Sequence, residues 1–194
     1  MRNRFLLALT LAGLTLAGTS ARAQTSSWVI DPAHSSVGFE IRHLGVSNVH
    51  GSISGLKGTV TLNEKDITKS SVEATIDTTT VSTNNDARDK HLKSPDFFDV
   101  AKYPQITFKS TSLTNTGGKL QLIGDLTLTG TTKSVTLDLD GPAPPQTSKD
   151  GKTRSGFSAT GSLKRSDFTV GTKFPSAMIG DDVKFTIDVE IDKQ

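Results

Sequence analysis

The stretch VKFTIDVEI, residues 183–191, decides the fold class of this chain. Apolar side chains occupy every second position in it: Val183, Phe185, Ile187, Val189 and Ile191. Successive side chains of a β-strand point to opposite faces, so the stretch predicts a strand with one apolar and one polar face. A parallel strand buried on both faces is apolar at nearly every position, so this alternation favours an antiparallel sheet.

The same alternation recurs along the chain and predicts eight strands. They cover residues 36–42, 59–62, 72–77, 106–109, 120–128, 135–139, 157–163 and 183–191, and residues 49–53 are a candidate ninth. Eight or nine antiparallel strands fit either an up-and-down barrel or a sandwich. Long strands with an evenly apolar face favour closure, because a barrel leaves no strand edge exposed. We therefore expect an all-β, antiparallel, eight-stranded barrel.

One segment, TNNDARDKHL at residues 83–92, lacks the alternation. It begins with residue types that cap helices, so we expect a short helix near residues 84–92.

Small residues occur at several inward positions of the expected barrel: Ala74, Gly124, Ala159 and Gly161. An eight-stranded barrel is wide enough either to be filled by its own side chains or to hold one small ligand. The small residues therefore either leave volume for a ligand or mark bends in a filled barrel, and both interpretations stay open.

Composition excludes several classes of protein. The chain has 194 residues and no cysteine, which rules out disulfides, zinc ribbons, iron–sulfur clusters and a thiol nucleophile. With 34% hydrophobic and 22% charged residues it is too apolar for disorder. No apolar run is long enough for an internal membrane-spanning helix.

Residues 1–23 have the pattern of a secretory signal peptide. Arg2 and Arg4 form a basic start, residues 5–17 form an apolar run, and residues 21–23 (ARA) form a small-x-small cleavage site. The alternative, an N-terminal anchor helix, is disfavoured because the run is shorter than a membrane span. We expect a mature domain at residues 24–194. Without the three arginines of the signal it has 19 basic and 20 acidic side chains, which gives no reason to expect nucleic acid or anionic membrane as partner.

Three polar residues are candidates for one end of a ligand site. His43 continues the inward phase of residues 37–41, so its imidazole either bonds a buried partner or meets the polar head of a ligand. Arg88 and His91 belong either to a solvated helix with pairs such as Asp86 with Lys90, or to the mouth of the barrel. The planar guanidinium of Arg88 suits an anionic or carbonyl head group.

Motifs for catalysis and cofactor binding are absent from the sequence. There is no P-loop, dinucleotide fingerprint or H-E-x-x-H, and the spacing of the four histidines matches no standard metal pattern. We therefore expect no catalytic residue, no metal and no cofactor.

Several blocks together resemble the YceI-like family. They are WVIDPAHSSVGF at residues 28–39, RHL at 42–44, TNN at 83–85 with Arg88 and Asp89, HLKSPDFF at 91–98, YPQITFKS at 103–110 and GDLTLTGTTK at 124–133. The resemblance implies a lipocalin-like barrel, secreted or periplasmic, that encloses a long apolar tunnel. Members of the family are regarded as binders of isoprenoid lipids or quinones rather than as enzymes.

The resulting hypothesis is a periplasmic carrier of an isoprenoid or other long-chain amphiphilic lipid, of the polyprenyl phosphate or quinone type. The candidate ligand-binding residues are Phe39, Ile41, His43, Val72, Ala74, Ile76, Arg88, His91, Phe97, Phe98, Phe108, Leu126, Leu128, Phe157, Ala159 and Phe185. Two alternatives stay open: a filled-core, stress-related secreted barrel without a small ligand, and an enzyme acting on a small secreted substrate. Whether the protein forms a homodimer also stays open.

Overall fold

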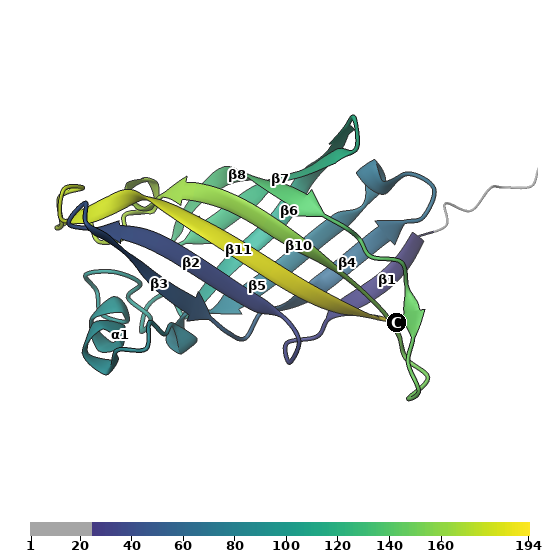
Figure 1. The fold of residues 1–194 in the computed structure, drawn as a ribbon, viewed down its shortest axis with the longest axis horizontal. Coiled ribbons are helices and arrows are strands. Elements are labelled where there is room, and N and C mark those ends of the chain that lie inside the picture. The colour runs from purple at the N-terminus through teal and green to yellow at the C-terminus, as the bar shows by residue number, and fades with distance from the viewer. Residues whose placement is uncertain (1–24) are drawn as a thin grey trace, which may run out of the picture.

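The computed structural model describes residues 25–194, so the expected signal peptide lies outside the described residues. Figure 1 shows long antiparallel strands wrapped around one axis. The strands are β1 (Thr25–Ile30), β2 (Ser36–His43), β3 (Ser47–Ile53), β4 (Lys57–Asn63), β5 (Ser71–Asp77), β6 (Gln105–Thr116), β7 (Lys119–Leu128), β8 (Thr131–Asp140), β9 (Gln146–Thr147), β10 (Thr153–Lys164) and β11 (Ile179–Lys193). The helices are α1 (Asp86–Leu92) and the short 3-10 turns η1 (Ile67–Lys69), η2 (Thr78–Thr80) and η3 (Arg165–Phe168).

Eight of the described strands close into a barrel, which confirms the expected fold class. Their order is β11-β1-β4-β5-β6-β7-β8-β10, and β10 pairs with β11 to complete the circle. Every one of these pairings is antiparallel. No described helix is long and apolar enough to cross a membrane.

Strand β11 joins the barrel to a two-stranded extension. Its last residues pair with β1, as in Ile191 opposite Ile30, whereas its earlier residues pair with β2, from Ile179 opposite His43 onward. The last part of β11 is therefore covered by β1, and the earlier part, which β1 does not reach, is covered by β2 with β3 beside it. An isolated bridge between Ser52 and Ser82 connects β3 to the segment that leads into α1.

The helix and several strands differ from the expectation in detail: β8 and β10 each begin four residues early, and the short β9 was not expected. Helix α1 begins at Asp86 rather than at residue 84, because Asn85 is its N-cap and accepts a hydrogen bond from the Arg88 amide. Strand β1 was not expected, since only Trp28 and Ile30 alternate in it. Strand β6 runs well past residue 109, because a register shift between Ser110 and Ser112 reverses its alternation.

Aromatic rings explain two of the small inward residues. A Cβ atom at Gly161 would lie 2.6 Å from the ring of Phe185 on the paired strand, and one at Gly124 would collide with the ring of Phe108. A third strand glycine, Gly51, is covered by Phe39 in the same way. These glycines make room for phenyl rings that lie flat on the inner wall, which neither earlier interpretation anticipated.

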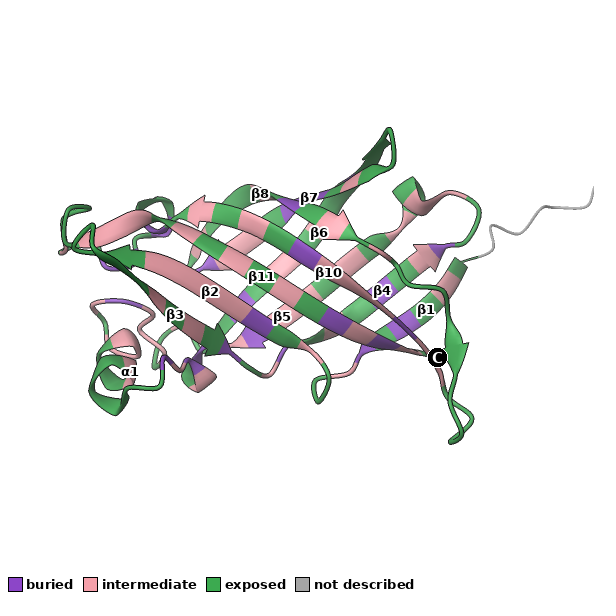
Figure 2. Cartoon of the chain, in the orientation of Figure 1, coloured by how far each residue is buried: buried purple, intermediate pink, exposed green. Residues whose placement is uncertain are grey.

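Buried residues alternate with more exposed ones along the strands (Figure 2). Their side chains form two clusters, which are the packed parts of the interior. The larger includes Trp28 and Ile191 at the β1 end and Phe97 and Phe168 near α1 and η3. The smaller consists of Leu113, Leu122, Leu137 and Ala159 on β6, β7, β8 and β10.

Candidate functional site

The barrel encloses a cavity of about 400 Å3. Side chains from most of the strands, from α1 and from the segments around η3 line it. All sixteen candidate ligand-binding residues are among the lining residues. The inward phase of the strands, together with α1 and the residues that follow it, therefore brings the predicted residues together in one place.

Inward side chains next to the cavity are only half-buried. Phe39, Phe108, Leu126, Phe157 and Phe185 all belong to this class, although each is on the inner face of its strand. In a filled barrel such side chains would be fully buried by their neighbours. The barrel is therefore hollow between its packed clusters.

Polar groups gather at a single end of the cavity, which we call the mouth. The polar lining residues are Arg42, His43, Thr83, Arg88, His91 and Arg165. They come from the end of β2, from α1 and the residues before it, and from η3, all on the left in Figure 1. None of the described lining residues is an acid. The cavity thus combines an apolar interior with a mouth that holds three arginines and no carboxylate.

Arg88 is held at the mouth by Thr83. Its Nε donates to Thr83 Oγ1 at 2.7 Å and its Nη2 donates to the Thr83 carbonyl at 2.9 Å. Thr83 Oγ1 in turn donates to Asp89, and this hydrogen bond lowers the pKa of Asp89 below its usual value. The Asp86–Lys90 pair of the solvated-helix interpretation is not among the ion pairs of the described residues. Two of the three guanidinium nitrogens are occupied, so the group keeps a fixed orientation and spare donor capacity.

His91 belongs to an aromatic cluster that closes one side of the mouth. Its ring meets Phe97 and Phe174 edge-on at 5.0 and 5.8 Å, and those two phenyl rings are stacked 5.2 Å apart. Its Nε2 lies 3.2 Å from Asp96 Oδ2. Asp96 also pairs with Lys173, and its carbonyl accepts from the Gly171 amide. The cluster connects α1 to the loop before β11.

Arg165, which the sequence did not single out, organises that loop. Its side chain is 4% exposed, and its nitrogens donate to the carbonyls of Val170, Gly171, Phe174, Ile179 and Gly180 at 2.5–3.1 Å. All its donors point at backbone, so Arg165 lines the cavity but has little capacity left for a ligand. The one hint in the sequence is the position of Arg165 directly after an alternating strand.

His43 lies at the rim of the cavity. It is the last residue of β2, it pairs with Ile179, and its side chain is exposed. The imidazole is therefore available to a ligand head group or to solvent rather than to a buried partner.

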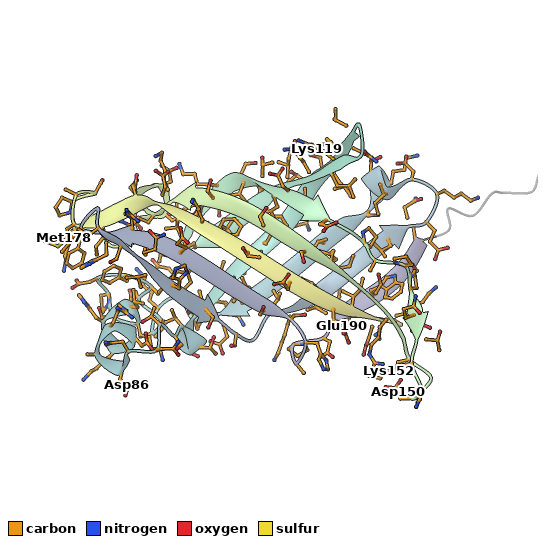
Figure 3. The ribbon with its side chains drawn as sticks, viewed as in Figure 1. Asp86, Lys119, Asp150, Lys152, Met178 and Glu190 are labelled. Atoms are coloured by element: carbon orange, nitrogen blue, oxygen red, sulfur yellow. The ribbon has the colours of Figure 1, made fainter. Side chains whose placement is uncertain are left out.

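A second polar cluster lies at the opposite end of the molecule, where Figure 3 labels Glu190. His34 Nδ1 is 2.7 Å from Asp31 Oδ2 and 3.7 Å from Glu190 Oε1, and its hydrogen bond with Asp31 raises the pKa of His34. These three side chains could offer ligands to a cation. Arg154 already lies 3.2 Å from Glu190, so the arrangement is that of an ion-pair network.

Known proteins with similar sequences place the chain in a family. The family model for the YceI-like domain matches residues 28–191. The chain belongs to the YceI-like family. YceI proteins of Escherichia coli O6:H1 and Shigella boydii are each 42% identical to it over 97% of both chains, and that of Salmonella arizonae is 41% identical over 95% of both.

Solved structures of other proteins share the barrel fold. The Campylobacter jejuni YceI protein is 33% identical, with a TM-score of 0.70 over 79% of this chain and 90% of its own. Burkholderia cenocepacia BcnA has a TM-score of 0.75 at 24% identity over 83% of this chain and 98% of its own. A polyisoprenoid binding domain from Saccharophagus degradans has a TM-score of 0.65 at 14% identity over 87% and 99%. The last two comparisons establish the fold alone.

Proposed function

We propose that this YceI-like protein binds one isoprenoid lipid or similar long-chain amphiphile, with the tail in the cavity and the head at the mouth. The observation that carries this proposal is the separation of chemistry along one cavity: a hydrocarbon interior and polar residues at a single end. An amphiphile has the same division. The similar fold of the polyisoprenoid binding domain from Saccharophagus degradans supports the proposal.

Burial of the tail supplies the affinity. Apolar surface transferred out of water is stabilised by roughly 25 cal/mol per Å2, or about 0.8 kcal/mol for each methylene group. A long tail is therefore insoluble in an aqueous compartment unless something encloses it. The hollow barrel supplies such an enclosure, and a filled-core barrel without a ligand does not account for the cavity.

The mouth favours an anionic or carbonyl head. Arg88 is oriented by Thr83, Arg42 donates to Asn48 at 3.0 Å, and neither forms an ion pair with a carboxylate of residues 25–194. Arg165 is saturated by backbone carbonyls, so Arg88, Arg42 and the two histidines are the groups left for the head. Polyprenyl phosphates and quinones both carry heads of this kind.

We further propose that the protein is a binding protein rather than an enzyme, and that it works in the periplasm after loss of its signal peptide. Family membership supports the first point. The second rests on the pattern of residues 1–23.

A chain-length series tests the proposal. Delipidated protein would be titrated with straight-chain phosphates and with alcohols of equal length, using native mass spectrometry. Affinity should rise about fourfold with each added methylene until the cavity is full. Arg88→Ala should weaken binding of the phosphates and leave binding of the alcohols unchanged. Lys184→Ala is the control, because Lys184 is exposed and alternates with the inward residues Val183 and Phe185 on β11. Affinity independent of chain length would overturn the proposal.

A further inference from the structure

The mouth of the cavity carries exposed apolar side chains that the packing of the barrel does not explain. Leu44, Val46 and Met178 are 55%, 78% and 43% exposed, and we call these three residues the apolar rim. The Leu44 amide donates to the Met178 carbonyl at 2.9 Å, so the β2–β3 turn and the loop before β11 are joined there. Figure 3 shows Met178 at the tip of the molecule, and Figure 2 shows this tip as exposed.

Turn chemistry adds a second observation. Leu44 and Gly45 have φ angles of 52° and 68°, and the Val46 amide donates to the His43 carbonyl across the turn. Asparagine, aspartate or glycine is strongly preferred at the first of these positions, because a bulky side chain is strained at positive φ. A leucine here works against the stability of the turn and presents an apolar side chain to water.

The rim is continuous with the cavity. Met178 is exposed on the outside and also lines the cavity, as do the neighbouring residues Arg42 and His43. A ligand tail that enters the barrel therefore passes directly beside the apolar rim.

Charge around the rim is complementary to an anionic surface. The turn at residues 42–48 and the loop at residues 169–180 contain Arg42 and Lys173 and no acid. Lys173 is already paired with Asp96 and Lys164 with Asp182, Asp181 accepts from Ser166, and Asp167 is exposed on η3. Arg42 and Arg88 are therefore the exposed cations at the mouth for which the described residues supply no ion pair, and they are the groups that face an anionic surface. The net charge of the mature domain gives no hint of this, because the separation of charge is local.

We infer that the apolar rim docks the mouth onto the surface of a lipid bilayer, so that an amphiphile moves between bilayer and cavity without crossing water. Exposed apolar side chains flanked by cations are the features that hold proteins at anionic lipid interfaces. The inference rests on the proposed function for its purpose, but the docking itself can be measured separately.

Vesicle flotation tests the docking. The full mature chain would be mixed with vesicles of phosphatidylethanolamine and phosphatidylglycerol, and with vesicles of phosphatidylcholine alone. We expect the parent to float with the anionic vesicles, and less so as salt is added. Leu44→Asn combined with Val46→Thr should reduce the floating fraction about tenfold, since it removes two apolar groups from the interface. Asparagine suits the turn, so the variant should fold.

The matched control is Val29→Thr, which alters an exposed valine on β1 far from the mouth and should float like the parent. A parent that does not float, a rim variant that floats unchanged, or an equal loss in Val29→Thr would overturn the inference. So would a parent dimer that the rim variant dissociates, because the rim would then bind a second copy. Rim-dependent flotation by a protein that binds no amphiphile from solution would instead refute the proposed function and leave the docking intact.

Discussion

Arg165 is the residue on which the shape of the mouth depends most. Its guanidinium satisfies five carbonyls of residues 170–180 from a buried position. A lysine cannot reach this planar arrangement, and carbonyls left without donors are costly. We predict that Arg165→Lys lowers the free energy of unfolding by about 3 kcal/mol, measured by urea denaturation. The control Arg42→Lys, on an exposed arginine, should change it by less than ~0.5 kcal/mol. Equal effects would contradict the role assigned to Arg165.

The contact between Gly161 and Phe185 gives a second prediction at this scale. The three atoms nearest to a methyl group at residue 161 would all be side-chain atoms, two of them in the Phe185 ring at 2.6 and 2.9 Å. Gly161→Ala should therefore destabilise the protein by about 1–3 kcal/mol. Adding Phe185→Leu should recover part of that loss, so the two substitutions should be non-additive in thermal unfolding. Gly38→Ala is the control, because nothing lies closer than 3.9 Å to the added carbon. Strictly additive effects would argue against the ring-on-glycine packing.

Residues of the cavity wall could be predicted from the sequence because the alternation of a strand assigns each side chain to a face. The lining of the cavity by Phe39, Leu126 and Phe185 follows from that rule alone. The role of Arg165 could not be predicted, because its partners are backbone carbonyls, which every residue has.

At the scale of elements, Asp96 connects α1 to the loop before β11. Lys173, and after it His91, lower the pKa of Asp96 below its ordinary value of 3.8. A carboxyl whose pKa is depressed by folding stabilises the structure above its ordinary pKa and loses that contribution as the pH falls through the folded value. We predict that the protection factor of the Gly171 amide, which donates to the Asp96 carbonyl, falls below about pH 4. Hydrogen exchange followed by mass spectrometry measures it once the intrinsic exchange rate at each pH is divided out.

The variant Asp96→Asn provides the comparison for that prediction. It keeps the size of the side chain and removes its charge, so the protection factor of the Gly171 amide should already be low at neutral pH and should not fall further in acid. Acid dependence that persists in Asp96→Asn would assign the effect to another carboxylate.

Two strands show the limits of prediction at this scale. Strand β1 has only two inward apolar residues, Trp28 and Ile30, and a pattern so short cannot be distinguished from chance. The predicted end of β6 at residue 109 was wrong because the bulge after Ser110 moves the next inward residue to Leu113. A one-residue insertion moves every later side chain to the opposite face, so the alternation read from residue 106 ends there.

For the molecule as a whole, the sequence predicted a closed barrel but left open whether it is filled or hollow. Both kinds of barrel have the same alternation, since each needs apolar residues inside. What separates them is whether inner side chains reach across the axis. Two features of the fold decide this: the added strands β2 and β3, which extend the wall, and rings such as Phe39 and Phe108, which lie against glycines of the wall instead of reaching across the axis.

Two alanines of the wall test the hollow interior. Ala74 is half-buried and faces the cavity, whereas Ala159 is 2% exposed and belongs to the cluster with Leu122 and Leu137. Ala74→Phe should fold with a melting temperature near that of the ligand-free parent and bind less amphiphile, because its ring takes cavity volume. Ala159→Phe should instead lose about 1–3 kcal/mol of stability through overpacking. The reverse pattern would mean that the open space lies elsewhere.

The most direct test of the proposed lipid-binding function is the lipid content of the purified protein. The mature chain would be isolated from a bacterial periplasmic extract without detergent, extracted with organic solvent, and analysed by mass spectrometry. Parent protein should release an isoprenoid or other long-chain amphiphile at about one molecule per chain, because one tail occupies the apolar cavity of the barrel. Ala74→Phe, purified alongside it, should release much less. An empty extract from folded parent protein that also takes up no added amphiphile would contradict the account.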